Sequence, residues 1–303
     1  MSTAILAPGP ALEAISDEID AHNSEKYSSS PTPFRHYPPT PTSPLLHFYT
    51  TQHTLQTYAY NLAARARFHS PARARPRHTI WSALLLLSSL VDASDPDAAA
   101  LSQLQHSLQT AEALRRDGRP RWMQFVGLVH DLGKLMAFVG GGVTQGGQWD
   151  VVGDTFPVGC GFREEMLVYP GTWGGNGDAG DEVYGTRLGV YEEGCGMGGL
   201  VMSWGHDEFL YQVLRGLGGR CRVPAVGLGV VRFHSFYGWH REGGYMEFMS
   251  EEEGDGEVLE AVRVFNGYDL YTKRDEEVDV EGVRGYWEGV IGEFIEGDGV
   301  IEW

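Results

Sequence analysis

Cysteine is scarce in this sequence, and the cysteines present form no recognisable pattern. Cys160, Cys195 and Cys221 are odd in number among 303 residues and lack CxxC spacing. Such usage predicts neither a disulfide framework nor a zinc ribbon. Reduced thiols are typical of the cytosol, and we therefore expect a cytoplasmic protein.

The sequence also lacks a long apolar run and an excess of positive charge. Its longest apolar stretch, near residues 83–87, is far too short to cross a bilayer, and no basic segment followed by an apolar one marks the N-terminus. The formal charge of -18 argues against a nucleic-acid or membrane partner, since both attract clustered Lys and Arg. A short basic run is interrupted by prolines and is interpreted as a solvated connection: Arg65, Arg67, Arg73, Arg75 and Arg77.

Glycine is nearly absent from the first 139 residues. Of 41 glycines, 37 follow residue 139, because only Gly9, Gly118, Gly127 and Gly133 precede it. We expect long irregular loops there, above all in residues 140–199. Residues 1–44 are rich in Ser, Thr and Pro, and we expect a mobile N-terminal arm followed by one catalytic domain over residues 45–303.

Helical periodicity dominates that domain. Apolar spacing predicts helices over residues 48–66, 78–91, 98–116, 121–139, 200–217 and 258–271. Residues 226–239 fit either a strand or a helix, because valines and glycines suit a strand while Val231, His234 and Ser235 are also spaced for a helix. The sequence predicts an all-α, predominantly helical fold.

The most informative feature is the pair His130-Asp131 within WMQFVGLVHDLGKLMAFVG. Apolar residues surround the pair on nearly every side at helical spacing, so the segment is expected to be buried. A buried carboxylate costs several kcal/mol unless a cation or a metal compensates it. A metal site is one interpretation, and a hydrogen-bonded pair that fixes the register of a helix is the other.

Further histidines and carboxylates extend this pattern. His106, His130, His206 and His234 lie in helical patterns, and Asp131 and Asp269 complete a nitrogen and oxygen ligand set suited to iron or manganese, with zinc possible. Taken singly, each histidine has another interpretation. His106 points away from its apolar stripe and is typical of a surface residue. His206 can pair locally with Asp207, and His234 can be a hydrogen-bonded core histidine. The remaining histidines lie in tails, loops or helix edges.

The order of these motifs resembles a known family. A histidine, then His-Asp, two further histidines and a final aspartate on successive helices resemble the HD-domain superfamily, and within it the myo-inositol oxygenase family. The matching stretches run in order through most of the chain: LVDASDPD at 90–97, QTAEALR at 109–115, VGLVHDLGKLMA at 126–137, VVGDTFPVGC at 151–160, LVMSWGHDEFLYQV at 200–213, VRFHSFYGWH at 231–240 and FNGYDLYTK at 265–273. HDLGK alone is a superfamily signal, whereas VVGDTFPVGC, SWGHDE and RFHSFY together are specific.

The resemblance implies an HD-domain-like helical bundle with long Gly-rich loops and two irons per chain, as a mixed-valent Fe(II)/Fe(III) pair. It assigns one iron to His106, His130 and Asp131, and the other to Asp131, His206, His234 and Asp269, with Asp131 bridging. No organic cofactor is needed. The inositol contacts that it implies are Arg35 on the N-terminal arm, Asp92, Ser94, Lys134, Gly153, Asp154, His234, Ser235 and Lys273. Asp131 and Lys134 would be the catalytic groups, with Lys134 supporting a substrate alkoxide through its charge.

The implied activity is ring cleavage of myo-inositol with O2 to D-glucuronate, by a monomer that binds neither nucleic acid nor membrane. The main alternative is an HD-type phosphohydrolase, in which metals activate water against a phosphoester. Its substrate would favour clustered Lys and Arg, which are only scattered here. A metal-binding regulatory protein without turnover is a third interpretation. Six candidate ligands argue against it.

Overall fold

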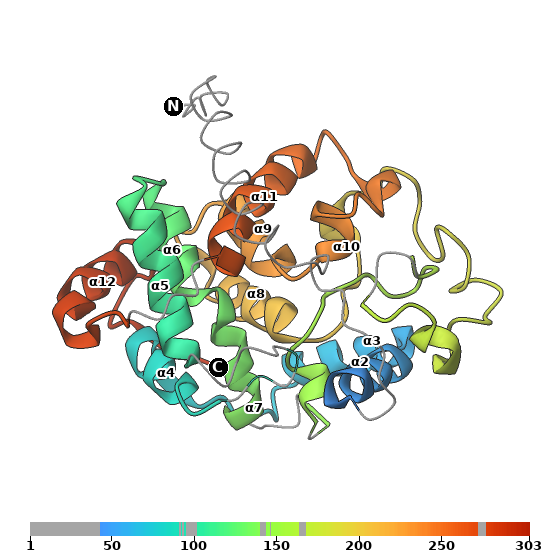
Figure 1. Ribbon diagram of the computed structural model, residues 1–303, viewed down its shortest axis with the longest axis horizontal. Helices are drawn as coiled ribbons and strands as arrows, with labels where there is room; N and C mark the ends of the chain where they lie inside the picture. The colour runs from blue at the N-terminus through green and yellow to red at the C-terminus, as the bar shows by residue number, and fades with distance from the viewer. Residues whose placement is uncertain are drawn as a thin grey trace.

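The computed structural model describes residues 43–90, 92, 94, 102–139, 144, 145, 147–163, 168–271 and 277–303. Helices dominate this part of the chain (Figure 1), as the sequence predicted. Strands β1 (Arg77–Thr79) and β2 (Val300–Glu302) form a small antiparallel sheet in which His78 pairs with Ile301. None of the described helices combines the length and the apolar character that a bilayer crossing requires.

The first predicted helix, over residues 48–66, is wrong as one element. Two helices occupy this region, α2 (Pro44–Leu55) and α3 (Tyr58–His69). Thr57 interrupts them because its side chain accepts a hydrogen bond from the Tyr60 amide and so caps a new helix. Helix α4 (Ile80–Leu87) is shorter than the predicted 78–91 because residues 77–79 form β1.

The His-Asp segment is buried as predicted, but it is not one regular helix. Helix α5 (Gln103–Arg116) packs against α6 (Arg121–Val129), and the chain then tightens into a 3-10 helix, η1 (His130–Leu135), before the short α7 (Met136–Val139). All six residues of η1 are buried. The 3-10 turn therefore carries both His130 and Asp131.

The C-terminal half completes the helical core. Its elements are α8 (His206–Gly216), α9 (Ala225–Phe233), α10 (Tyr237–His240), α11 (Asp255–Tyr271) and α12 (Val280–Phe294). The ambiguous residues 226–239 are thus helical, and α8 begins six residues later than predicted. Helix α12 has no counterpart among the predicted helices. Helix α9 packs between α8 and α11 in the middle of the molecule (Figure 1), while α6 contacts α12.

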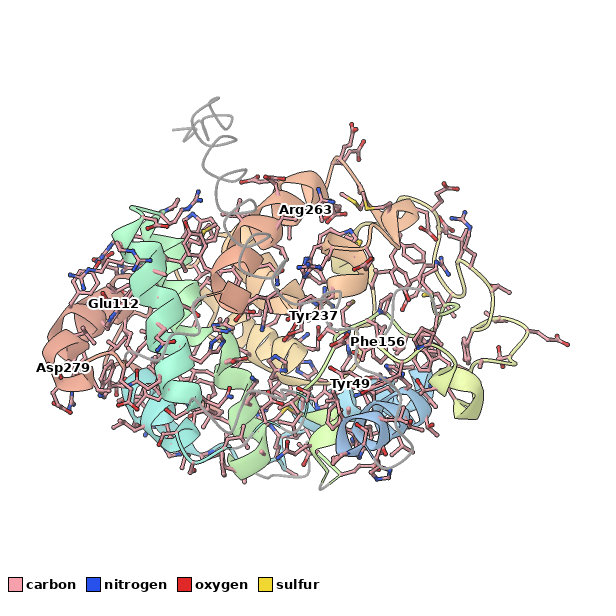
Figure 2. All side chains as sticks on the ribbon, viewed as in Figure 1. Tyr49, Glu112, Phe156, Tyr237, Arg263 and Asp279 are labelled. Carbon is pink, nitrogen blue, oxygen red and sulfur yellow. The ribbon has the colours of Figure 1, made fainter. Side chains whose placement is uncertain are left out.

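In the part of the chain that the structure describes, glycine-rich segments form long loops, as predicted, and these loops contain short 3-10 turns. These turns are η2 (Gln148–Asp150), η4 (Thr172–Gly175), η5 (Met197–Gly199), η6 (Gly218–Arg220) and η7 (Met246–Phe248). The loops pack on the helices through buried aromatic rings. Tyr49 and Phe156, both labelled in Figure 2, lie in this region. The ring centroids of Phe156 and Trp173 lie 5.9 and 5.0 Å from that of His53.

The basic run is not simply a solvated connection. Arg73 is buried and donates to the carbonyl oxygen of the C-terminal Trp303 at 2.8 Å. Arg65 pairs with the buried carboxylate of Glu208 at 3.0 Å. Both arginines therefore connect distant parts of the chain, a role that charge patterning alone could not reveal.

Candidate metal centre

Four histidines that are far apart in the sequence converge in the core. His106 lies on α5, His130 opens η1, His206 opens α8 and His234 follows the last residue of α9. All four are buried, so the interpretation of His106 as a surface residue is wrong. Helix α5 is buried on almost every side because α4, α6, η1 and α11 all pack against it, and its apolar stripe alone gave no sign of this.

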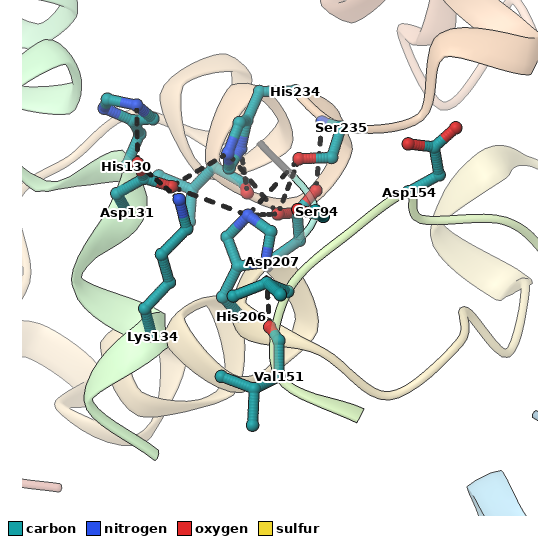
Figure 3. A network of polar contacts seen from close by, with 12 residues as sticks. Ser94, His130, Asp131, Lys134, Val151, Asp154, His206, Asp207, His234 and Ser235 are labelled. Atoms are coloured by element: carbon teal, nitrogen blue, oxygen red, sulfur yellow. Dashed lines mark hydrogen bonds and ion pairs between the residues drawn. The ribbon is translucent and has the colours of Figure 1, made fainter. Parts of the chain in front are cut away.

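Asp131 lies between the two pairs of histidines, and its two oxygens face different pairs. Oδ2 is 3.7 Å from Nε2 of His106 and 3.6 Å from Nε2 of His130. Oδ1 is 3.6 Å from Nε2 of His206 and 3.9 Å from Nε2 of His234. Figure 3 shows Asp131 beside His130 at one side of the drawn network. Two groups that could each hold a metal ion share Asp131: His106, His130 and Asp131, and Asp131, His206 and His234.

Asp269 on α11 adds a second carboxylate to the first group. Its Oδ1 is 2.8 Å from Nε2 of His106 and 3.1 Å from Nε2 of His130. The resemblance placed this residue with His206 and His234, and the observed contacts correct that pairing. Helix α11 reaches the site beside α5, which brings Asp269 to the side of His106.

The imidazole rings are oriented for ligation through Nε2. The Nδ1 atoms of His130, His206 and His234 each donate to a backbone carbonyl oxygen at 3.0 Å, those of Gly127, Val151 and Val231. A neutral imidazole protonated at Nδ1 carries its lone pair on Nε2. Nε2 of His234 is buried without a hydrogen-bond partner in the part of the chain that the structure describes. Lone pairs that face carboxylates require a cation between them, so these residues fit a metal.

Electrostatics support the same conclusion. Burial alone would raise the pKa of Asp131, but Lys134 and His130 hold it well below its usual value. Burial would likewise raise the pKa of Asp269, and His130 and His106 hold it well below that value. Burial would lower the pKa of His130, yet the carboxylates of Asp131 and Asp269 raise it. The site is therefore rich in negative charge and attracts cations.

A glycine allows the two halves of the site to meet. A Cβ atom on Gly133 of η1 would lie 1.9 Å from the carbonyl oxygen of His206, far inside van der Waals contact. Only a residue without a side chain permits η1 to approach the start of α8 this closely. The glycine of HDLGK thus brings Asp131 to within reach of His206.

Lys134 connects the metal ligands to another predicted group of residues. Its Nζ donates to Asp131 Oδ2 and Gln103 Oε1 at 2.9 Å each and lies 2.8 Å from Asp92 Oδ2. Asp92 in turn accepts from the amide and the hydroxyl of Ser94, at 2.8 and 2.6 Å. Burial would lower the pKa of Lys134, but Asp131 and Asp92 raise it, so the ammonium stays charged.

The other predicted substrate residues lie on two segments. Gly153 adopts φ 92°, and Asp154 accepts from the Tyr49 hydroxyl at 3.2 Å. The amide of Thr155 donates to the Ser235 carbonyl oxygen at 3.0 Å, which joins this loop to the end of α9. Figure 3 shows Asp154 apart from the histidine cluster, with Ser235 lying between. Arg35 and Lys273 fall outside the described residues.

Asp207 is a member of the site that the sequence interpretation missed. Its carboxylate is fully buried, with Oδ1 2.8 Å from Nε2 of His206 and 3.4 Å from Nε2 of His234. The sequence indicated Asp207 only as a local partner of His206. A sequence signal existed, since SWGHDE repeats the His-Asp dipeptide of LVHDLGK.

Comparison with known proteins identifies one family. A family profile described as "Myo-inositol oxygenase" matches residues 43–303. The chain is similar to a probable inositol oxygenase of Oryza sativa subsp. japonica, with 41% identity over 245 residues that cover 80% of this chain and 76% of the relative. It is similar to an inositol oxygenase of Danio rerio, with 40% identity over 76% of this chain and 82% of the relative. An inositol oxygenase of Rattus norvegicus is 36% identical over 98% of this chain and 99% of the relative.

Proposed function

Because the chain belongs to the myo-inositol oxygenase family, we propose that it cleaves the ring of myo-inositol with O2 to give D-glucuronate and water. The observation that carries this proposal is the position of Asp131, whose two oxygens face two separate pairs of histidines. A carboxylate in this position suits a bridge between two metal ions.

The proposed metals are two irons. His106, His130 and Asp269 would hold one of them, His206 and His234 the other, and Asp131 would bridge both. When bound, a mixed-valent Fe(II)/Fe(III) pair supplies O2 activation and Lewis acidity toward two adjacent hydroxyls. The histidine tautomers fixed by backbone carbonyls keep the Nε2 atoms free for ligation.

The surrounding residues suit a neutral polyol. Carboxylate and hydroxyl groups from Asp92, Ser94, Asp154 and Ser235 offer short hydrogen-bonding side chains and little apolar surface. Lys134 is held charged beside Asp131, where it would stabilise negative charge on a substrate oxygen. The proposed substrate contacts at Gly153, His234, Arg35 and Lys273 complete the set. No organic cofactor, a monomeric state and a cytoplasmic location are part of the same proposal.

The phosphohydrolase alternative gains no support from the site. Among the described residues, Lys134 is the only lysine or arginine in an ion pair with Asp92 or Asp131, whereas a phosphate group favours clustered Lys and Arg. A phosphate group at this site would have to approach four carboxylates, those of Asp92, Asp131, Asp207 and Asp269. Apart from Lys134, the only cationic partners of these carboxylates among the described residues are histidines.

The decisive experiment measures O2 uptake and product together. Purified protein loaded with iron should consume O2 on addition of myo-inositol in a one-to-one ratio with the D-glucuronate formed, because the conversion removes four electrons and adds one oxygen atom. Inositol phosphates and nucleotides serve as competing substrates. Phosphate release from them, without O2 uptake on myo-inositol, would reject the oxygenase and favour the phosphohydrolase.

A further inference from the structure

Ser235 is held by one carboxylate through both of its hydrogen-bond donors. Its amide donates to Asp207 Oδ2 at 3.1 Å, and its hydroxyl donates to Asp207 Oδ1 at 3.2 Å. Asp207 is fully buried and Ser235 nearly so. Figure 3 shows the two residues facing each other across the start of α8 and the end of α9. The backbone and the side chain of Ser235 are therefore fixed relative to His206 and His234.

The direction of the Ser235 hydroxyl follows from the tautomer of its other neighbour. Ser235 Oγ also lies 3.3 Å from Nε2 of His206, whose Nδ1 donates to the Val151 carbonyl oxygen. When Nε2 of His206 binds a metal, it has no lone pair left to accept the serine proton. Among the contacts of this hydroxyl within the described residues, Asp207 then remains as the acceptor. The lone pairs of Oγ stay available to accept a hydrogen bond.

We propose that Asp207 is a positioning residue that makes the Ser235 hydroxyl a hydrogen-bond acceptor for one hydroxyl of the bound polyol. The inference rests on the proposed function, since it assumes a polyhydroxylated substrate next to Ser235. It assigns to Asp207 a role that acts through Ser235, although Asp207 Oδ1 also lies 2.8 Å from Nε2 of His206 and 3.4 Å from Nε2 of His234. The site would thus require that one substrate hydroxyl donate at this point, which discriminates against analogues that cannot donate there.

The test combines variants with a series of deoxyfluoro-inositols, each with one hydroxyl replaced by fluorine. Fluorine cannot donate a hydrogen bond, so each analogue removes one donor. Binding is measured by calorimetry on iron-loaded protein without O2, with metal content determined for every sample. The variants are Asp207→Asn and Ser235→Ala. The asparagine amide can donate to Ser235 Oγ, which would turn the serine proton toward the substrate.

For the unchanged protein, one analogue should bind about tenfold more weakly than myo-inositol because of the donor lost at Ser235. That penalty should disappear in both variants, while penalties at the other ring positions persist. The matched control is Asp178→Asn, which alters another buried carboxylate, the acceptor for the Tyr58 amide. It should leave every penalty unchanged. Metal content should be the same in all proteins.

An unchanged penalty in Asp207→Asn would overturn the inference, and so would metal loss from that variant, because Asp207 would then belong to the metal site. Thermal unfolding identifies a variant that does not fold, and Asp207→Ser then replaces it, since a serine there can also donate to Ser235. O2 uptake tests the proposed function separately. If myo-inositol binds without O2 uptake, the oxygenase proposal is rejected, and the binding test of Asp207 still applies. If O2 is taken up but the binding penalty of the fluorinated analogue is unchanged in Asp207→Asn, only the role of Asp207 is rejected.

Discussion

Nε2 of His106 lies 2.8 Å from Oδ1 of Asp269, although 163 residues separate them in the sequence. This contact joins α5 to α11 and places the final aspartate with the first pair of histidines. It gives each proposed metal its own set of ligands, with Asp131 shared between them. The two sets should therefore respond differently to substitution.

Replacing Asp269 with Ala should weaken the binding of one metal and leave the other unchanged, because only the first set loses a ligand. The first set would keep only His106, His130 and the shared Asp131, while His206 and His234 keep their contacts with Asp131. Asp131→Ala should remove both metals, because each set loses a ligand. Metal analysis after dialysis measures the ratio, with Asp178→Asn as the control. Equal loss from both variants would show that the two sets do not bind independently.

Replacing Lys134 with Met should abolish most turnover while the metals remain bound. Asp131 would still be compensated by the metals, but Asp92 would lose its only cation partner among the described residues and remain a buried charge. Breaking such a pair costs about 3–5 kcal/mol in the free energy of unfolding. Urea denaturation, metal content and O2 uptake measure the three effects. Metal loss would instead make Lys134 a structural partner of Asp131.

Much of the fold was accessible from the sequence because periodicity reports burial on one face of a helix. It placed helices near α4, α5, α6, α8 and α11, and it predicted the burial of His130-Asp131. Periodicity failed where a capping side chain or a tighter turn sets the limits of a helix. The Thr57 cap divides one predicted helix into two, and the 3-10 geometry of η1 is invisible to a 3.6-residue pattern.

The candidate site depended on the order of motifs more than on periodicity. His106 is buried because helices pack on both of its sides, so an amphipathic pattern misplaced it. The pairing of Asp269 with His106 depends on how α11 lies against α5, which no local pattern records. Asp207 was missed because its partner Ser235 is 28 residues away in the sequence.

Replacing Gly133 with Ala should destabilise the protein and weaken metal binding. The new Cβ would lie 1.9 Å from the His206 carbonyl oxygen, so η1 and α8 must separate. Overpacking of this kind costs about 1–3 kcal/mol. The control is Gly289→Ala in the exposed middle of α12, where no atom of the described residues outside the neighbouring helix backbone lies within 4 Å of the added Cβ. It should stabilise the protein by up to about 1 kcal/mol. Denaturant unfolding and metal content distinguish the two, and a stabilised Gly133→Ala protein would contradict the close approach.

His53 should make the stability of the fold depend on pH. His53 lies on α2 and is buried against the loop that contains η4, where its Nδ1 lies 2.5 Å from the Thr172 hydroxyl. This burial lowers the pKa of His53 from 6.5 to about 3. The unfolded chain binds a proton near pH 6.5 and the folded chain does not. The stabilisation is therefore complete above about pH 6.5 and is lost as the pH falls toward 3.

The expected slope from this residue is at most about 1.4 kcal/mol per pH unit in the free energy of unfolding. His53→Gln removes the titrating group and retains a side chain that can contact Thr172, so the dependence on pH between about 4 and 6.5 should become shallower. The matched control is His47→Gln on the exposed side of α2, which should leave the slope unchanged. Urea unfolding at several pH values measures both variants. An unchanged slope in His53→Gln would show that other buried groups, and not His53, set the acid sensitivity of the fold.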